Sequence, residues 1–235
     1  MSDQGKPVES LAEALAQASS LPGDLTEKLA AYLAHSRRLR PDFVAAYDRL
    51  IAHLELLYSG RIGPAVGDRM PDFLLPDQQG ALVSLDGLLK SGPVVISMNR
   101  GHWCPYCKLD LRALADAEPE IRRMGAQLVS IMPDKAKFSK KAVADNHVPF
   151  RILSDIDLSY ALSLGLIYWV GPEIKQLYDD LGLDLEDVQG NRSYFLPMAA
   201  KFIVSGDGVI KAREVDIDFR QRMGPRAILA ALANL

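Results

Sequence analysis

The apolar side chains of the first sixty residues recur at intervals of three and four, and no run in this stretch alternates as a strand does. Asp24 and Glu27 stand three residues apart before an apolar run, which is the spacing of a helix-capping box. Pro41 suits the first position of a further helix, which carries one apolar stripe. The members of this stripe are Phe43, Tyr47, Leu50, Ile51, Leu54 and Leu57. We expect the stripe to be covered by the rest of the chain or by a second subunit.

Beyond residue 71 the pattern changes to short apolar runs that alternate with helical segments. We predict strands at residues 81–85, 93–98, 126–132, 150–153, 200–204 and 209–215, and helices at residues 104–123, 135–146, 158–164, 172–181 and 223–234. Asp207-Gly208 predicts a hairpin between the last two strands. This order is typical of a mixed α/β fold with one antiparallel edge. Glycine and proline near residue 64 mark a linker, so we divide the chain into a helical N-terminal extension, 1–64, and a main domain, 65–235.

Composition narrows the classes of function. Of the 235 residues, 49% are hydrophobic and 24% are charged, which excludes a disordered or fibrous chain. The 27 basic and 30 acidic residues are interspersed and give a net charge of −3, whereas a nucleic-acid partner held by bulk charge needs a basic face. No apolar run approaches the ~18 residues of a membrane span, and the first ten residues carry no apolar signal core. We therefore expect a cytoplasmic protein without a membrane or nucleic-acid partner.

The two cysteines of the chain fall within four residues, in the segment Cys104-Pro105-Tyr106-Cys107. This segment follows a predicted buried strand and opens a predicted helix. The unpaired N–H groups and the dipole at a helix N-terminus favour a thiolate, and such cysteines have a pKa lowered from ~8.5 to roughly 3.5–7.5. Cys107 lies near the same helical face, so the pair can cycle between dithiol and disulfide, with Cys104 attacking and Cys107 resolving. Arg100 is a second candidate source of positive charge, and Trp103 a candidate shield for the sulfur.

Two other interpretations of the cysteine pair remain open. A Cys-x-x-Cys pair is half of a zinc site, although the chain has no second cysteine pair and its four histidines show no ligand spacing. These histidines are His35, His53, His102 and His147. The pair could also be two inert buried side chains of an interaction module. Neither a metal nor another cofactor is part of the favoured redox interpretation.

The segment Arg100-Gly101-His102-Trp103-Cys104-Pro105-Tyr106-Cys107 resembles the Arg-Gly-x-Trp-Cys-Pro-Tyr-Cys signature of a peroxiredoxin-like branch of the alkyl hydroperoxide reductase/thiol-specific antioxidant (AhpC/TSA) family, within the thioredoxin superfamily. Gly67-Asp68-Arg69-Met70-Pro71-Asp72-Phe73 resembles the entry segment of that family. The resemblance covers about residues 65–235. It implies a thioredoxin-like α/β fold, reduction of a hydroperoxide or disulfide, and an external dithiol such as thioredoxin as the reductant.

The chain departs from this family pattern at two places. The family places Pro and Thr or Ser seven and three residues before its attacking cysteine, where this chain has Ser97 and Gly101. The hydroxyl that would help to bind a peroxide is therefore missing from its usual position, and the Cys-x-x-Cys pairing favours thiol–disulfide exchange. Thioredoxin-like proteins also hold a cis-proline opposite the cysteine pair, and either Pro197 or Ala199 takes that position here.

The remaining candidates have simpler interpretations. His102 is predicted to be an exposed turn residue rather than a proton carrier. Asp110, which could assist deprotonation of Cys107, and Asp116 are predicted to lie on a solvated helix face. The cluster Lys135, Lys137, Lys140 and Lys141 is predicted to be a solvated face rather than a docking site. From these observations we expect a thiol oxidoreductase that reduces hydroperoxides through Cys104 and Cys107. The alternative is a thiol–disulfide oxidoreductase with little peroxidase activity. A homodimer is a possible assembly.

Overall fold

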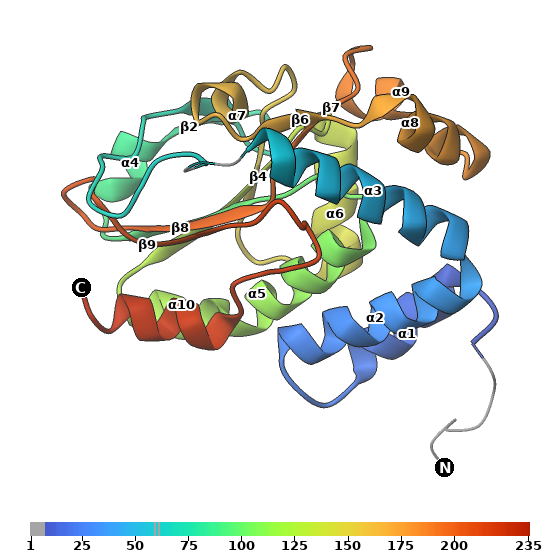
Figure 1. The fold of residues 1–235 in the computed structure, drawn as a ribbon. Coiled ribbons are helices and arrows are strands. Elements are labelled where there is room, and N and C mark those ends of the chain that lie inside the picture. Colours follow the sequence, from blue (N-terminus) through green and yellow to red (C-terminus); the bar gives the residue numbers. More distant parts are fainter. Residues whose placement is uncertain (1–7, 59, 61) are drawn as a thin grey trace.

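The computed structural model describes residues 8–58, 60 and 62–235, and a five-stranded sheet lies at its centre (Figure 1). Its strands are β3 (Val94–Met98), β4 (Gln127–Met132), β5 (Arg151–Ser154), β8 (Ala200–Val204) and β9 (Ile210–Val215). The order across the sheet is β5-β4-β3-β8-β9. The first three of these are parallel, and β8 pairs antiparallel with both β3 and β9. The predicted mixed sheet with an antiparallel edge is confirmed.

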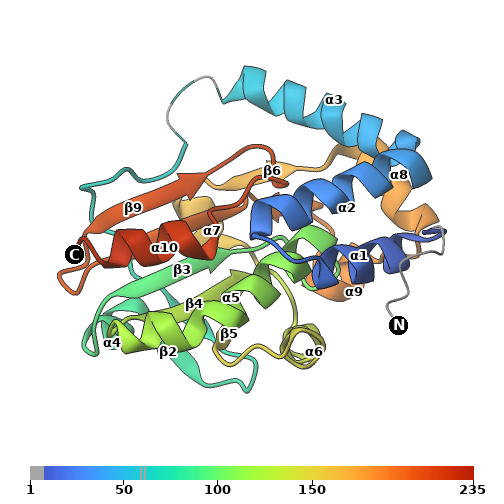
Figure 2. The same cartoon turned by 90° about the horizontal axis from the view of Figure 1, so that it is seen from below.

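Alternate side chains of β3 enter two separate cores, because successive residues of a strand point to opposite faces of the sheet. Val94 and Ile96 join the larger core, and Val95 joins the smaller one. The helices α5 (Pro105–Arg123) and α10 (Pro225–Leu232) lie side by side over the smaller core, on the face seen in Figure 2. The helix α6 (Ala136–Asn146) contacts β5 and α5. With both faces covered, β3 is wholly buried, as its apolar run predicts.

Three helices precede the sheet: α1 (Leu11–Ser20), α2 (Leu25–Leu39) and α3 (Pro41–Leu57). The predicted capping box of Asp24 and Glu27 is present, and Pro41 is the first residue of α3. The helix α2 packs against α5, and α3 packs against α8 (Gly171–Asp180). The stripe on α3 is therefore covered by the same chain over most of its length, and only its last member, Leu57, is exposed.

Several short elements were not predicted from the sequence. The strands β1 (Leu74–Pro76) and β2 (Leu82–Ser84) form one antiparallel pair, of which β2 was predicted, and the unpredicted β6 (Ile167–Trp169) and β7 (Phe195–Pro197) form another. The helices α4 (Leu85–Leu89), α7 (Ser159–Ser163) and α9 (Leu185–Gln189) are each five residues long, and only α7 was predicted. Segments this short carry too few residues for a periodic pattern to show, so pairing with distant segments decides their conformation.

Two further features concern the backbone and the surface. The described residues contain no cis peptide bond, so neither Pro197 nor Ala199 is preceded by one. Pro197 ends β7, and Ala199 immediately precedes β8. In the described part of the chain, every helix is too short or too polar to cross a membrane.

Candidate active site

Cys104 occupies the N-cap position of α5, directly after the turn that follows β3. Its backbone is extended, with φ −76° and ψ 120°, and Pro105 is the first helical residue. A proline fits there because the N–H that it lacks would have had no partner within the helix. The Cys104 N–H donates to the carbonyl of Gly101 at 3.2 Å, which closes the turn. The predicted position of the sulfur at a helix N-terminus is thus observed.

The turn requires glycine at position 101. Gly101 has φ +145°, a conformation that residues with side chains rarely adopt. A Cβ atom there would lie 2.5 Å from Nε1 of Trp103 and 2.8 Å from Oδ1 of Asp134. No hydroxyl-bearing side chain can therefore stand at this position without displacing its neighbours.

Both cysteines are free thiols with no solvent exposure, and two buried arginines contact them. Arg100 Nη1 lies 3.7 Å from Cys104 Sγ, and the Arg100 backbone N–H donates to Cys107 Sγ at 3.4 Å. Arg222 Nη2 lies 3.5 Å from Cys107 Sγ. The predicted approach of Arg100 to Cys104 is observed, whereas Arg222 was not foreseen.

The two thiols have opposite pKa shifts. Burial opposes ionisation of Cys104, but a hydrogen bond from Cys107 and the charges of Arg100 and Arg222 outweigh it and lower the pKa of Cys104 to about 5. Burial and the neighbouring Cys104 raise the pKa of Cys107 well above its ordinary value. At neutral pH the pair therefore holds one thiolate, on Cys104, and one protonated thiol, on Cys107.

Arg100 is held by aromatic side chains from three distant segments. Its Nη2 donates to the hydroxyl of Tyr178 at 2.7 Å and to the hydroxyl of Tyr47, and these two hydroxyls contact each other. Its guanidinium lies over the ring of Phe219 at 3.7 Å and over that of Trp103 at 5.1 Å. Trp103, the candidate shield for the sulfur, packs against the guanidinium of Arg100 and lines the same cavity as Cys104. The sequence signal for Tyr47 was a tyrosine within an otherwise mostly aliphatic stripe.

A chain of buried polar groups runs beneath the cysteine pair. Arg222 Nη1 approaches Asn99 Oδ1 at 3.5 Å, and Asn99 Nδ2 donates to Ser97 Oγ at 3.0 Å. Ser97 in turn donates to Asp110 at 3.2 Å, and Asp110 forms an ion pair with Lys201. The prediction that Asp110 is solvated is wrong, because its carboxylate faces the sheet and is completely buried.

The other predictions for this region have mixed outcomes. The prediction of an exposed His102 is wrong, because its ring stacks on Phe138 and its Nδ1 lies 3.0 Å from Asp134. Asp116 is exposed, as predicted. The lysine cluster on and beside α6 is a largely solvated face, with Lys137 paired to a carboxylate across 2.8 Å. Among the described residues, no group of three or more His, Cys, Asp or Glu side chains is arranged to hold a metal ion.

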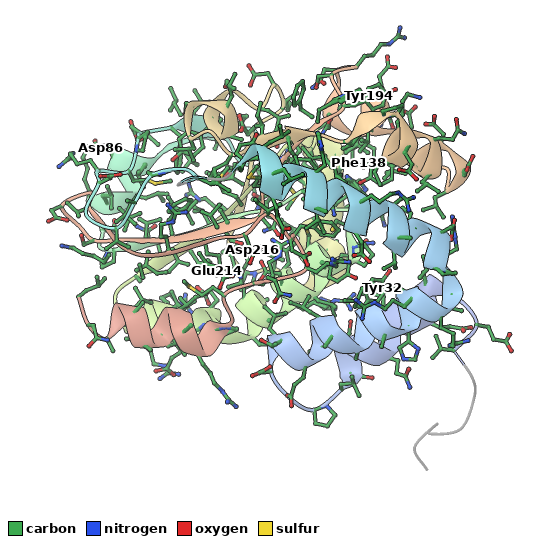
Figure 3. The ribbon with its side chains drawn as sticks, viewed as in Figure 1. Tyr32, Asp86, Phe138, Tyr194, Glu214 and Asp216 are labelled. Atoms are coloured by element: carbon green, nitrogen blue, oxygen red, sulfur yellow. The ribbon has the colours of Figure 1, made fainter. Side chains whose placement is uncertain are left out.

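A cavity of about 50 Å³ opens beside Cys104, and the N-terminal helices form much of its wall. From these helices come Tyr32, Phe43, Val44 and Tyr47, and from the main sheet domain come Arg100, Trp103, Cys104, Tyr106 and Phe219. Tyr32, which Figure 3 labels, lies between α2 and α3 in that view. Cys104 lines this cavity, whereas Cys107 does not. A small molecule with an apolar body that enters the cavity therefore meets the sulfur of Cys104 first.

Comparison with known proteins places this geometry in context. The model of the AhpC/TSA family matches residues 66–213. The chloroplastic peroxiredoxin Q of Sedum lineare is 33% identical over 89 residues, which are 38% of this chain and 47% of that protein. The 1-Cys peroxiredoxin PER1 of Hordeum vulgare is 26% identical over 156 residues, 63% of each chain. The chain spans less than half the length of the peroxiredoxin Q relatives that it matches.

Solved structures show the same architecture. Peroxidoxin BcpB of Mycobacterium tuberculosis superposes with a TM-score of 0.57 at 21% identity, covering 74% of this chain and 99% of that one. Reduced Prx3 of Vibrio vulnificus superposes with a TM-score of 0.58 at 17% identity, covering 72% of this chain and 99% of that one. The predicted thioredoxin-like α/β fold with helices added at the N-terminus is confirmed.

Proposed function

The chain belongs to the AhpC/TSA family, and from this premise and the geometry around Cys104 we propose that it is a thiol-dependent peroxidase that reduces hydroperoxides. One observation carries the proposal. Cys104 stands at the N-cap position of α5, has a pKa of about 5, lies beside Arg100 and forms part of a cavity wall. A thiolate at neutral pH with access to a cavity is the nucleophile that this reaction needs.

In the first step the Cys104 thiolate attacks one oxygen of the hydroperoxide. A sulfur–oxygen bond forms while the oxygen–oxygen bond breaks, so the sulfur is oxidised by two electrons and the peroxide is reduced. The proton of the hydroperoxide passes to the oxygen that leaves, which gives an alcohol, or water from hydrogen peroxide, and a sulfenate on Cys104. Arg100 stabilises the negative charge throughout, because its guanidinium stays within reach of the sulfur.

In the second step Cys107 resolves the oxidised sulfur. The protonated sulfenic acid and the Cys107 thiol form a disulfide and release one water molecule. The raised pKa of Cys107 depends in part on the charge of its neighbour Cys104. That contribution disappears once Cys104 carries a neutral sulfenic acid, so Cys107 becomes easier to ionise at the stage where it is required. Arg100 N–H and Arg222 then stabilise its thiolate.

The proposal extends to the reductant, the compartment and the domain division of the chain. We take a thioredoxin-like dithiol as the reductant that restores the pair, since a disulfide is reduced by exchange with a second dithiol. The cytoplasm suits a chain whose two cysteines must return to the dithiol state. The family match begins at residue 66, which supports residues 1–64 as an extension of a domain at 65–235.

The proposal is tested by rapid mixing of the prereduced chain with hydrogen peroxide and with an alkyl hydroperoxide. We expect oxidation far faster than that of a free thiol, and a mass loss of two hydrogens. Cys104→Ser abolishes the reaction, and Cys107→Ser stops it at a sulfenic acid that a selective reagent traps. A rate equal to that of a free thiol, or peroxide consumption by Cys104→Ser, would refute the proposal. The match to the AhpC/TSA family and to the peroxiredoxin Q relatives supports peroxide reduction over the disulfide-exchange and metal-binding alternatives.

A further inference from the structure

The active-site turn supplies the guanidinium of Arg100 to the proposed peroxidase reaction, but no side-chain hydroxyl three residues before Cys104. Charge develops on the oxygen that leaves as the oxygen–oxygen bond breaks, and a hydrogen-bond donor aimed at that oxygen lowers the barrier. Position 101 is three residues before Cys104 and carries no side chain, and a Cβ there would clash with Trp103 and Asp134. A hydroxyl donor must therefore come from another part of the chain.

We propose that Tyr47, on α3 of the N-terminal extension, is a catalytic residue whose hydroxyl donates a hydrogen bond to the departing oxygen of the hydroperoxide. This inference rests on the proposed peroxidase function. Tyr47 and Cys104 line the same cavity. One guanidinium joins them, because Arg100 Nη2 contacts the Tyr47 hydroxyl while Nη1 lies 3.7 Å from Cys104 Sγ.

The count of protons around Arg100 leaves one hydroxyl proton for a substrate. A guanidinium only donates hydrogen bonds, so the hydroxyls of Tyr47 and Tyr178 both accept from Arg100. The two hydroxyls also contact each other, and that contact uses a single proton. One of the two O–H protons is thus left without an acceptor among the described residues. When Tyr178 donates to Tyr47, the O–H proton of Tyr47 is the one without an acceptor. Tyr47, unlike Tyr178, lines the cavity, so this proton is available to a substrate there.

The hydroxyl of Tyr47 is also held in the protonated form. Burial raises the pKa of Tyr47 above its ordinary value, although the charge of Arg100 opposes this. A neutral hydroxyl fixed by two hydrogen bonds needs no reorganisation when the charge develops. In the balanced step, thiolate and hydroperoxide give sulfenate and alcohol, and Tyr47 is not consumed.

The test compares Tyr47→Phe with Tyr58→Phe in the full chain. Tyr58 follows the last residue of the same helix, and its hydroxyl donates to the Ile167 carbonyl at 2.8 Å, so its variant also loses one hydroxyl, but away from the cavity. Two rates are measured for each reduced protein: oxidation by tert-butyl hydroperoxide and alkylation by iodoacetamide. The alkylation rate reports the thiolate fraction of Cys104 and the folding of the site, and it involves no peroxide.

We expect Tyr47→Phe to lower the second-order rate with the hydroperoxide by about 10²-fold, the effect of removing one such donor. Its alkylation rate stays that of the wild type, and Tyr58→Phe keeps both rates. Equal losses of both rates in Tyr47→Phe would show that Tyr47 only positions Arg100, and would overturn the proposal. A larger loss in Tyr178→Phe than in Tyr47→Phe would assign the donor to Tyr178. A wild type no faster than a free thiol would refute the peroxidase function itself, whereas a fast Tyr47→Phe would refute this inference alone.

Discussion

Arg100 is the group whose removal tests the electrostatics of the site most directly. Its guanidinium lies 3.7 Å from Cys104 Sγ. At an effective dielectric constant of about 20, two unit charges at this separation attract by roughly 4 kcal/mol. Since about 1.4 kcal/mol corresponds to one pKa unit, the loss of Arg100 raises the pKa of Cys104 by ~3 units. The Arg100→Met variant keeps an unbranched apolar stem against Phe219 while it removes the charge.

The expected result is a pKa of roughly 8 in place of about 5 for Cys104. At pH 7 the thiolate fraction then falls to about one tenth, so alkylation by iodoacetamide slows by ~10-fold. The assay measures the rate of alkylation as a function of pH in proteins that also carry Cys107→Ser, so that Cys104 is the one sulfur of a cysteine that reacts. Arg49→Met is the matched control, because Arg49 is an exposed residue of α3 paired with Glu173. A pKa still below ~6 in Arg100→Met would refute the reasoning, since Arg100 would then contribute less than one third of the calculated attraction.

Three other perturbations have defined outcomes. The lowered pKa of Cys104 stabilises the fold fully above the pKa of 9.0 of the unfolded thiol, and this contribution is lost as the pH falls toward about 5. In urea unfolding of the reduced chain, the free energy of unfolding should rise with pH by up to ~1.4 kcal/mol per pH unit, and Cys104→Ser should flatten that slope. Asp110→Asn should destabilise the chain by about 3–5 kcal/mol by stranding the buried Lys201, and Asp110→Leu with Lys201→Met should recover most of the loss; no recovery would contradict this account. Gly101→Thr should cost at least about 1–3 kcal/mol and slow the reaction with peroxide, because φ is +145° and the new side chain meets Trp103; a faster peroxidase would show that the turn adapts.

Local signals predicted the elements that carry the chemistry. The strand before Cys104, the turn and the helix after it depend on residues near one another in the chain, so β-branched runs and Pro105 sufficed. The capping box at Asp24 formed as its spacing indicates. Three-residue strands such as β6 and β7 were missed, because their pairing joins segments about thirty residues apart.

The environment of the cysteine pair was predicted least well. Asp110 has the helical position of a solvated carboxylate, yet Lys201, 91 residues away, pairs with it in the interior. His102 was expected in solvent, and the approach of α6 covers it with Phe138. In each case the residue type favours exposure, and a partner from a distant segment reverses the outcome by satisfying the polar group in the interior.

The sequence by itself determined the order of the five central strands and of the helices between and after them, the two sulfurs at the start of a helix, and the glycine in the turn before them. These properties arise from backbone preferences and from contacts between close neighbours. Only the tertiary structure decided that Arg222 meets Cys107 from 115 residues away and that Tyr47 reaches Arg100 across 53. Such contacts depend on how α3 and the segment after β9 fold over the sheet, and side-chain packing across the whole molecule, rather than any local pattern, sets that arrangement.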